Sequence, residues 1–479
     1  MTGVAELSAK LASGEVTSVA LVTQALARIE ALNPKLNAFT DVLRERALKQ
    51  AASVDQQRSQ GVLLGPLAGV PFAVKNLFDI QDLVTRAGAI ILDQQAPASQ
   101  DAVLVARLQS TGAVLVGALN MDEFAYGFTT ENSHVGPCHN PHDLSRISGG
   151  SSGGSGVAVA ADLVPLTLGS DTNGSIRVPA SLCGVWGLKP TFGRLSRRGT
   201  YPFVNSIDHL GPLASDLSGL AWSYDAMQGP DADDPGCHAA SVQPVTPSMA
   251  QGITGNMTQG VAGNMTQGVK DLRIGVLGGY FKDNASEAAM DVLQQAASVL
   301  GAKQQDVLWP DATLGRMAAF IISASEGGNL HLQHLRDQAA QMEPLSVDRF
   351  FAGALQPATW YVQAQRYRRV YRDKINALFA DWDVLLAPAT PVVAPPIGTE
   401  WLTINGQNQP CRAAMGLLTQ PVSLIGCPVV CAPMWPKNES LPLGVQIIAA
   451  PWREDLAFRA AWTLAQSGLA HTPPAKALS

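Results

Sequence analysis

The N-terminal part of the chain repeats apolar residues with the period of an amphipathic helix. Between residues 18 and 33 these side chains recur every three or four positions, at Val19, Val22, Leu26, Ile29 and Leu32. That spacing places them on one face, where they can pack against a core. A hydroxyl at Thr17 or Ser18 can cap the start of the helix, and Asn33-Pro34 predicts its end.

Short apolar runs elsewhere have the length of buried strands. One such run, GVPFAV, ends at Lys75, and residues 101–119 begin as a helix and end in the strand-like AVLVGAL. Similar runs occupy residues 163–169, 272–278 and 383–388, and polar helices are predicted over 39–60 and 357–381. This alternation of helices and strands predicts an α/β architecture around a buried sheet.

Residues 229–271 differ from the rest of the chain in composition. They are rich in Gly, Pro, Asp, Ser and Gln, and they contain the tandem copies GNMTQGVA and GNMTQGVK. Two copies of eight residues are too short to build a repeat protein. We therefore expect a surface loop with a short duplication.

Composition and charge narrow the class of protein. Hydrophobic residues make up 46% of the chain and charged residues 15%, enough for a large core. A net charge of −6 disfavours a nucleic-acid binder, which would carry a basic surface. The N-terminus has no signal-peptide pattern, and no apolar run is long enough to cross a membrane. The six cysteines never form CxxC, so we expect reduced thiols in a cytoplasmic protein.

The most informative segment begins with GGSSGGSG, between residues 149 and 156. A flexible linker is disfavoured because apolar sequence follows at once and no composition boundary lies here. A phosphate-binding loop is disfavoured because the Lys-Ser/Thr ending of that motif is missing. A tight active-site loop fits best, since glycines permit unusual dihedrals and close approach of the backbone.

Two further residues suggest acyl-transfer chemistry. Ser175, in DTNGSIR, follows a predicted strand, in a turn whose backbone N–H groups can converge on an oxyanion. No Ser-His-Asp pattern surrounds a GxSxG motif, so another base is needed. Lys75 is the best-placed candidate, because burial can lower a lysine pKa enough to leave the amine neutral. Taken singly, such a serine is more often a turn residue and such a lysine a surface residue.

Together these motifs resemble the amidase signature family. GVPFAVKN resembles its lysine motif, GGSSGG its central serine motif and GSDTNGSIRVPA its nucleophile motif, and order and spacing also agree. NMDEFAYGFTTENS and GLKPTFGRLS resemble further family blocks. The resemblance implies an α/β amidase signature fold, in which helices cover a large mixed β-sheet. It implies one domain over residues 1–479, divided into N-terminal helices (1–60), a signature core (61–228), the surface loop (229–271) and a C-terminal substrate wall (272–479).

The resemblance also implies roles for individual residues. Ser175 is then the nucleophile, Ser151 a proton relay that follows a cis peptide bond, and Lys75 the terminal base. Ser152 supports Lys75 by hydrogen bonding. The backbone amides of Thr172, Asn173 and Gly174, with that of Ser175, form the oxyanion hole. Many members have Gly-Gly before the nucleophile, whereas this chain has Asn173-Gly174. No metal ion or other cofactor is implied.

The family contains the glutaminase subunits of tRNA-dependent amidotransferases, which bind the substrate at both its carboxylate and its amino group. Arg368 aligns with their carboxylate-binding arginine, although an ordinary arginine on a polar helix is the simpler interpretation. Gly416 stands where they carry the aspartate that holds the amino group. The sequence therefore favours an anionic amide without an α-amino group.

A narrower resemblance is to a branch of the family that acts on carboxylated biuret in bacterial s-triazine degradation. It rests on blocks such as SIDHLGPL, YDAMQGPD, ASEGGNLHL and EPLSVDRF. It implies hydrolysis of 1-carboxybiuret to ammonia and urea-1,3-dicarboxylate, in cyanuric acid degradation. It also implies a dimer of heterodimers, each of which contains a small helical partner subunit. Tyr126, Arg177 and His209 lie in matched blocks and are candidates for the substrate pocket, or for core packing and structural hydrogen bonds.

Three alternatives remain open from the sequence. The chain could be the glutaminase subunit of an amidotransferase, which needs a tRNA-binding partner, or a general aliphatic amidase. It could also be a partner subunit that kept the fold and lost the chemistry. The last alternative is disfavoured, because Lys75, Ser151 and Ser175 are all functional residue types.

Overall fold

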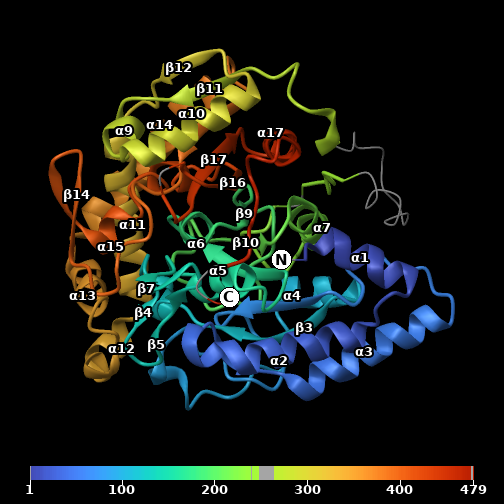
Figure 1. The fold of residues 1–479 in the computed structure, drawn as a ribbon. Helices are drawn as coiled ribbons and strands as arrows, with labels where there is room; N and C mark the ends of the chain where they lie inside the picture. The colour runs from blue at the N-terminus through green and yellow to red at the C-terminus, as the bar shows by residue number, and fades with distance from the viewer. Residues whose placement is uncertain (1, 239, 247–263, 438, 476–477, 479) are drawn as a thin grey trace.

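A computed structural model describes residues 2–238, 240–246, 264–437, 439–475 and 478. An 11-stranded sheet runs through the described part of the chain, in the order β1-β3-β2-β8-β10-β9-β16-β17-β13-β11-β12 (Figure 1). Pairings of β2 with β3 and β8, and of β11 with β12 and β13, are parallel, and the others are antiparallel. The predicted α/β fold with a large mixed sheet is confirmed.

The strands of this sheet are short, and most are completely buried. They are β1 Phe39–Val42, β2 Pro71–Lys75, β3 Val114–Leu119, β8 Leu166–Asp171, β9 Trp186–Lys189, β10 His209–Ala214, β11 Ile274–Leu277, β12 Gln304–Val307, β13 Val384–Pro388, β16 Val429–Met434 and β17 Leu443–Ala449. In the part of the chain that the structure describes, three two-stranded sheets lie outside it: β4 Glu131–Asn132 with β5 Gly136–Pro137, β6 His139–Asn140 with β7 Asp143–Ile147, and β14 Trp401–Ile404 with β15 Gln407–Pro410.

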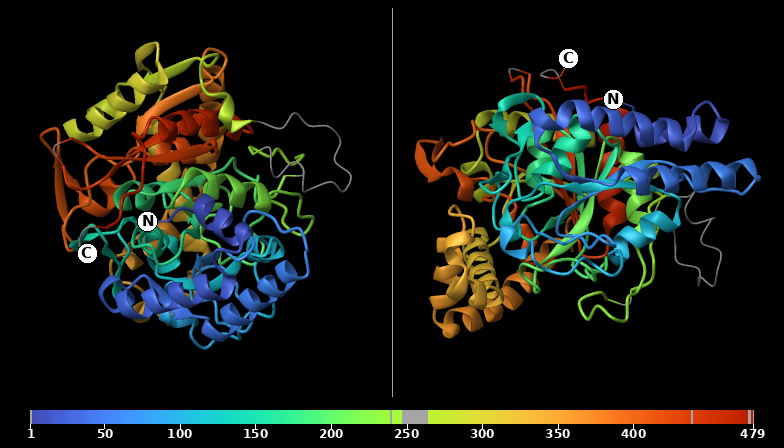
Figure 2. Two further views of the ribbon diagram at one scale, coloured as in Figure 1. Left: turned by 45° about the vertical axis from the view of Figure 1, so that its right-hand side comes forward. Right: turned by 90° about the horizontal axis from the view of Figure 1, so that it is seen from below.

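Helices surround the sheet (Figure 2). They are α1 Val4–Ser13, α2 Ser18–Leu36, α3 Arg44–Ser59, α4 Val103–Ser110, α5 Gly153–Ala160, α6 Arg177–Cys183, α7 Leu217–Met227, α9 Tyr280–Asp283, α10 Glu287–Leu300, α11 Ala312–Leu330, α12 Leu332–Asp337, α13 Val347–Leu355, α14 Ala358–Leu378, α15 Cys411–Ala414, α16 Gln420–Ser423 and α17 Glu454–Gln466. Helix α5 is buried along its whole length, because small residues let it lie against the strands.

The two faces of the sheet belong to two hydrophobic clusters. In β3, Val114 and Val116 join the cluster that contains α5, while Leu115 between them joins the other. Successive side chains of a strand point to opposite faces, so a continuous apolar run is what a sheet covered on both sides requires. This explains why buried strands such as β2 and β3 could be predicted from apolar runs alone.

Two N-terminal predictions are wrong in their bounds. The first helix continues through Pro34 and ends at Leu36, where Asn37 takes a left-handed conformation and donates its N–H to Asn33 O. Proline interrupts one helical hydrogen bond but does not force the chain to leave the helix at once. Residues 39–42 form strand β1 at the edge of the sheet, and the second helix begins at Arg44. The N-terminal region therefore contributes a strand as well as helices.

The first copy of the duplication lies outside the described residues, and the described part of the second copy contains a short 3-10 helix over Met265–Gln267. On either side of residues 229–271, the chain contributes strands to the same sheet. The single domain stays a prediction. Among the described residues, no helix combines the length and apolar character that spanning a membrane requires.

Candidate active site

Lys75 is the last residue of the buried strand β2, and its amine lies inside the protein. The side chain is 0% exposed. Its Nζ donates to the hydroxyl oxygens of Ser151 at 2.6 Å, Ser170 at 2.9 Å and Ser152 at 3.1 Å. These three acceptors match the three N–H donors of a lysine ammonium group. The amine is therefore held by hydroxyls, without a direct ion pair.

Burial gives this lysine an unusual pKa. Removal from water lowers the pKa of Lys75 to about 7, although the charges of Asp122, Asp208 and Asp171 act to raise it. At neutral pH the neutral amine is thus well populated. A neutral amine can accept a proton from a hydroxyl that contacts it, which is the property a general base needs.

The loop between β7 and α5 brings Ser151 and Ser152 to this amine. The Gly150–Ser151 peptide bond is cis, and both serines are 0% exposed. A side chain at Gly150 would overlap Asp122 Oδ2, so the loop requires glycine there. Ser152 Oγ accepts from Lys75 and from the Ser170 N–H at 3.2 Å, and donates to Ser170 O at 3.1 Å. Ser152 thereby joins the loop to strand β8.

Ser170 is a contact of Lys75 that the sequence analysis did not identify. It lies near the end of β8, which pairs in parallel with β2 so that Val74 faces Leu168. Carboxyl ends of parallel strands meet at one edge of a sheet, which brings Ser170 beside Lys75. The available signal was a polar residue at the end of an apolar strand that neighbours β2.

Ser175 lies in the turn between β8 and α6, and Asp171 and Arg177 hold this turn. The Asp171 carboxylate accepts from the Ile176 N–H at 3.2 Å and from Arg177 Nε and Nη2, both at 2.9 Å. Burial acts to raise the pKa of Asp171, but the charge and hydrogen bonds of Arg177 outweigh it and hold that pKa well below its usual range. This buried ion pair connects the end of the strand to the start of the helix.

The turn also contains consecutive backbone N–H groups without a partner in the described chain. Gly174 has φ +143°, and a side chain there would overlap Thr419 Oγ1, which donates to Asn173 O at 2.7 Å. No hydrogen bond within the described chain uses the backbone N–H of Asn173, Gly174 or Ser175. Consecutive free N–H groups beside a serine can stabilise an oxyanion. The Thr172 side chain is held separately, because its Oγ1 donates a hydrogen bond to Asp208 Oδ1 at 2.6 Å.

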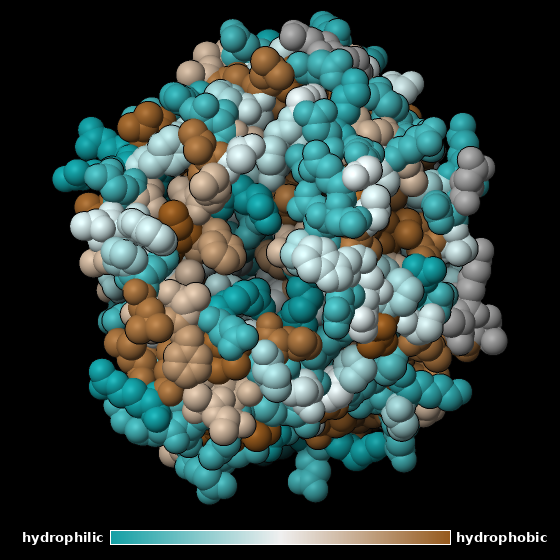
Figure 3. Space-filling view, turned by 90° about the vertical axis from the view of Figure 1, so that its left-hand side faces the viewer, coloured by the Kyte–Doolittle hydropathy of each residue, from teal (hydrophilic) through white to brown (hydrophobic). Residues whose placement is uncertain are grey.

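Ser175 opens into a pocket on the face of the molecule that carries α11, α13 and α15. Figure 3 views this face, where apolar and polar side chains surround a hollow. The lining includes Tyr126 and Asn173, together with Arg316 of α11 and Arg349 of α13. No Asp or Glu is among the described residues that line it. The pocket therefore favours an anionic ligand.

The two arginines of the pocket are each oriented by a contact. Arg316 Nε donates to Gln420 Oε1 at 2.9 Å, and Arg349 Nη2 donates to Tyr126 O at 2.6 Å. The Arg349 guanidinium also lies 4.2 Å from the centre of the Tyr126 ring. Because a guanidinium has five N–H donors, each arginine keeps donors for a ligand. Sequence reasoning missed both residues, since no local motif connects them to Ser175.

Arg368, the predicted carboxylate ligand, does not line this pocket. Its Nε donates to Leu424 O and its Nη2 to Ser206 O, both at 2.7 Å. Backbone carbonyls thus hold the guanidinium between α14 and two loops. The arginines of α14 have similar neighbours in the sequence. Only the packing of the helix decides whether each of them contacts backbone carbonyls or a pocket.

The other predicted pocket residues divide into two groups. Tyr126 lines the pocket, and its hydroxyl has no hydrogen-bond partner within the described chain. Arg177 is 0% exposed, and besides Asp171 it donates to Gln446 Oε1 at 2.7 Å. His209 is also buried, with Nδ1 3.0 Å from Asp171 O. Arg177 and His209 therefore stabilise the turn through Asp171 and do not line the pocket.

Gly416 stands beside the pocket wall, where no side chain fits. A Cβ at this position would overlap the ring of Phe128, which lines the pocket. An aspartate at 416 would need the ring to move. The packing agrees with a site that has no acidic partner for an ammonium group.

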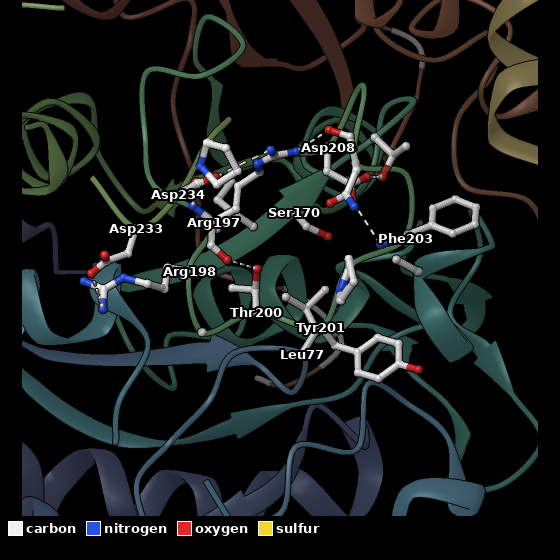
Figure 4. A pocket seen from close by; sticks show the side chains of 17 residues that line it. Leu77, Ser170, Arg197, Arg198, Thr200, Tyr201, Phe203, Asp208, Asp233 and Asp234 are labelled. Atoms are coloured by element: carbon white, nitrogen blue, oxygen red, sulfur yellow. Dashed lines mark hydrogen bonds and ion pairs between the residues drawn. The ribbon is translucent and has the colours of Figure 1, made fainter. Parts of the chain in front are cut away.

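A second pocket lies beyond Thr172 and reaches Ser170 (Figure 4). Ala125, Thr172 and Phe203 line both pockets. Figure 4 shows Ser170 on the strand at the back of this second pocket, with Asp208 beside it. Since the Ser170 hydroxyl contacts Lys75 Nζ, one side chain separates the buried amine from this pocket.

Candidate metal ligands do not gather in the described part of the chain. It contains no group of three or more His, Cys, Asp and Glu side chains arranged to hold a metal ion. All six cysteines are free. Burial raises the pKa of Cys427 and of Cys431 to about 12, so these residues pack as neutral thiols.

Comparison with known proteins agrees with this geometry. The family model described as Amidase matches residues 20–457. The chain belongs to the amidase family. Among curated amidase relatives, the AtzE chain of 1-carboxybiuret hydrolase from Pseudomonas sp. (strain ADP) is 61% identical over 97% of this chain and 98% of that protein. The A chain of glutamyl-tRNA(Gln) amidotransferase from Rhodopirellula baltica (strain DSM 10527 / NCIMB 13988 / SH1) is 35% identical over 98% and 97%.

A solved structure of an amidase relative gives the same result. It is described as an unexpected vestigial protein complex that reveals the evolutionary origins of an s-triazine catabolic enzyme. It is 60% identical to this chain, covers 99% of it and 100% of its own chain, and superimposes with a TM-score of 0.94. The predicted membership of the amidase signature family, and the activity of a hydrolase acting on amide C–N bonds, are confirmed.

Proposed function

We propose that this enzyme hydrolyses the terminal amide of 1-carboxybiuret, producing ammonia and urea-1,3-dicarboxylate. The observation that carries the reaction is Lys75, buried among three serine hydroxyls and 2.6 Å from Ser151. The substrate is supported by the relative at 61% identity that is named for this activity. The pocket beside Ser175 supports it independently, because it presents two arginines and no described acid.

The reaction begins with proton transfer along the serines. The neutral amine of Lys75 takes the proton of Ser151, which takes the proton of Ser175 as Ser175 Oγ bonds to the amide carbon. Backbone N–H groups of the turn stabilise the oxyanion. The C–N bond then breaks, and the nitrogen leaves as ammonia with the proton returned through Ser151.

Hydrolysis of the acyl-enzyme repeats these transfers in the same order. Water gives its proton through Ser151 to Lys75 while its oxygen bonds to the acyl carbon. The bond to Ser175 breaks, and Ser175 recovers its proton. The net change is one amide and one water converted to one carboxylate and one ammonium ion. Besides the substrate and this water, these steps use residues of the chain.

Charge in the pocket determines the substrate class. Arg316 and Arg349 bind the carboxylate at the far end of the substrate, since guanidinium groups bind carboxylates through paired hydrogen bonds. Glutamine has the same number of atoms between amide and carboxylate, but it carries an ammonium group as well. Neither the described lining nor Gly416 supplies an acid for that group. Glutamine is therefore a poor substrate.

We propose that the chain functions in the cytoplasm together with a small helical partner subunit, as a dimer of heterodimers. The support is that one relative is named as one subunit of its enzyme, while a similar structure is described as a protein complex. Mass measurement in solution tests this assembly. Co-expression with the small protein encoded nearest to this gene should give a stable complex of both chains, whereas a purified chain that stays active and monomeric contradicts it.

The deciding experiment measures ammonia release from 1-carboxybiuret, biuret, glutamine and a simple aliphatic amide, by the wild type and by Ser175→Ala. Selective, Ser175-dependent turnover of 1-carboxybiuret is expected. Preference for glutamine would support the amidotransferase glutaminase in its place. Turnover of the aliphatic amide alone would keep the serine chemistry and reject the substrate.

A further inference from the structure

Asn173 lines the pocket of Ser175, and its side chain has a buried hydrogen-bond acceptor without a partner in the described chain. The side chain is 7% exposed and lines this pocket. Its Nδ2 donates to Ser323 Oγ at 2.8 Å, while Oδ1 has no hydrogen-bond partner within the described chain. Buried polar atoms are nearly always paired, so an unpaired acceptor in a pocket indicates a donor that arrives with the ligand.

Asn173 is held once through its side chain and once through its main chain. Ser323 belongs to α11 and fixes the side chain, and Thr419 Oγ1 fixes the main chain through its hydrogen bond to Asn173 O. The acceptor therefore cannot leave the pocket by a simple side-chain rotation. A fixed acceptor discriminates between ligands better than a mobile one, because it cannot find another partner when the ligand has no donor.

Asn173 lies close in the chain to the serine that would receive the acyl group of the substrate. It lies two residues before Ser175, and both line the same pocket. The group that becomes bonded to Ser175 must occupy this pocket, since the oxyanion-stabilising N–H groups belong to the same turn. Atoms next to the reacting carbonyl carbon thus come close to Asn173.

We infer that Asn173 Oδ1 accepts a hydrogen bond from a substrate N–H next to the reacting carbonyl, which makes Asn173 a specificity residue for ureido amides over alkyl amides. The inference rests on the proposed function, in which Ser175 carries the acyl group. The unpaired hydroxyl of Tyr126 complements it as a donor to a substrate carbonyl. A ureido chain alternates N–H and C=O and satisfies both groups, whereas an alkyl chain leaves both buried and unpaired.

Two stable probes of equal length test this role. Malonurate, which is urea acylated on one nitrogen by malonate, keeps the N–H and the carbonyl that follow the reacting amide. Glutaramate, the monoamide of glutarate, has methylene groups in both places. Each probe ends in a carboxylate, and the wild type should hydrolyse malonurate with the higher kcat/KM. In Asn173→Ala, the malonurate-to-glutaramate ratio of kcat/KM should fall roughly tenfold to 100-fold.

Two serines of α11 give a matched pair of controls. Ser323→Ala removes the anchor of the Asn173 amide, so the ratio should fall in the same direction by a smaller factor. Ser325→Ala removes a hydroxyl that contacts Gln356 instead, and the ratio should stay at the wild-type value. If Asn173→Ala does not fold, the comparison of Ser323→Ala with Ser325→Ala still tests the inference.

The outcomes separate this inference from the proposed function. Turnover of 1-carboxybiuret by the wild type decides the proposed function without any variant. Equal losses of kcat/KM on malonurate and glutaramate in Asn173→Ala would overturn the role of Asn173 and leave that function standing. A wild type that prefers glutaramate to malonurate would also overturn it.

Discussion

Two lysines of the described chain are buried at the ends of sheet strands, and their surroundings differ. Lys75 ends β2 and Lys189 ends β9, and both are 0% exposed. Burial lowers the pKa of each to about 7. By residue type, burial and pKa, the two lysines are therefore alike.

Their hydrogen-bond partners differ. Lys75 Nζ contacts three hydroxyls, whereas Lys189 Nζ donates to two backbone carbonyls, Pro190 O at 3.1 Å and Cys427 O. A hydroxyl can give a proton to a neutral amine, but a carbonyl oxygen only accepts. Only Lys75 can therefore exchange a proton with its neighbours. Partners, rather than burial or pKa, distinguish a candidate base from a structural lysine.

The largest expected difference comes from removing each lysine. Lys75→Met should lower kcat on 1-carboxybiuret by at least about 10³-fold, because no other group takes the serine proton. Lys189→Met should keep kcat within about tenfold but lower the free energy of unfolding by about 2 kcal/mol, since two buried carbonyls lose their donor. Steady-state kinetics and thermal melting measure the two effects. Equal losses of kcat would remove the distinction between the lysines.

The pH dependence of wild-type kcat/KM tests whether Lys75 is the base. The Lys75 amine is protonated below its pKa of about 7 and cannot then act as a base. We therefore expect kcat/KM to fall about tenfold for each pH unit below 7 and to level off above it. Lys189→Met should keep this profile. A wild-type profile that is flat between pH 5 and pH 8 would contradict the role of Lys75.

Two arginines also differ in their surroundings, because Arg316 lines the pocket and Arg368 binds backbone carbonyls. Arg316→Met should raise KM for 1-carboxybiuret roughly tenfold to 100-fold, because it removes donors to the carboxylate. Arg368→Met should change KM less than about threefold and lower the melting temperature, since that guanidinium holds backbone carbonyls. Substrate titrations and melting curves distinguish the two outcomes. A larger KM effect at Arg368 would restore the sequence-based assignment.

The Ser170 hydroxyl should contribute less to catalysis than the Lys75 amine that it contacts. Ser170→Ala should lower kcat about tenfold, and should shift the acid limb of the pH profile to lower pH. The sign follows because the Ser170 hydroxyl accepts from the charged amine, and its loss favours the neutral form. Ser155→Ala is the matched control, since that buried hydroxyl contacts Leu168 O and not Lys75. An unshifted profile in Ser170→Ala would show that this contact does not affect the titration.

Much of the fold could be predicted because its strands are buried on both faces. The apolar runs ending at Lys75 and Leu119 read as strands without any periodic signal, and both are strands. The edge strand β1 was missed, because a half-exposed four-residue segment beside charged residues carries a weak pattern. The end of α2 was misplaced because proline is only a local signal, while the hydrogen bonds of Asn33 to Ala38 and Phe39 hold the chain beyond it.

Sequence motifs alone predicted the reacting groups, since a glycine-rich turn and a lysine after an apolar strand are local features of the chain. Tertiary structure alone decided the surroundings of those groups. It placed Ser170 on Lys75 through strand pairing, brought Arg316 and Arg349 to Ser175 from separate helices, and directed Arg368 away. These placements depend on tertiary structure because a pocket forms between elements distant in the chain, and packing fixes which side chains face it.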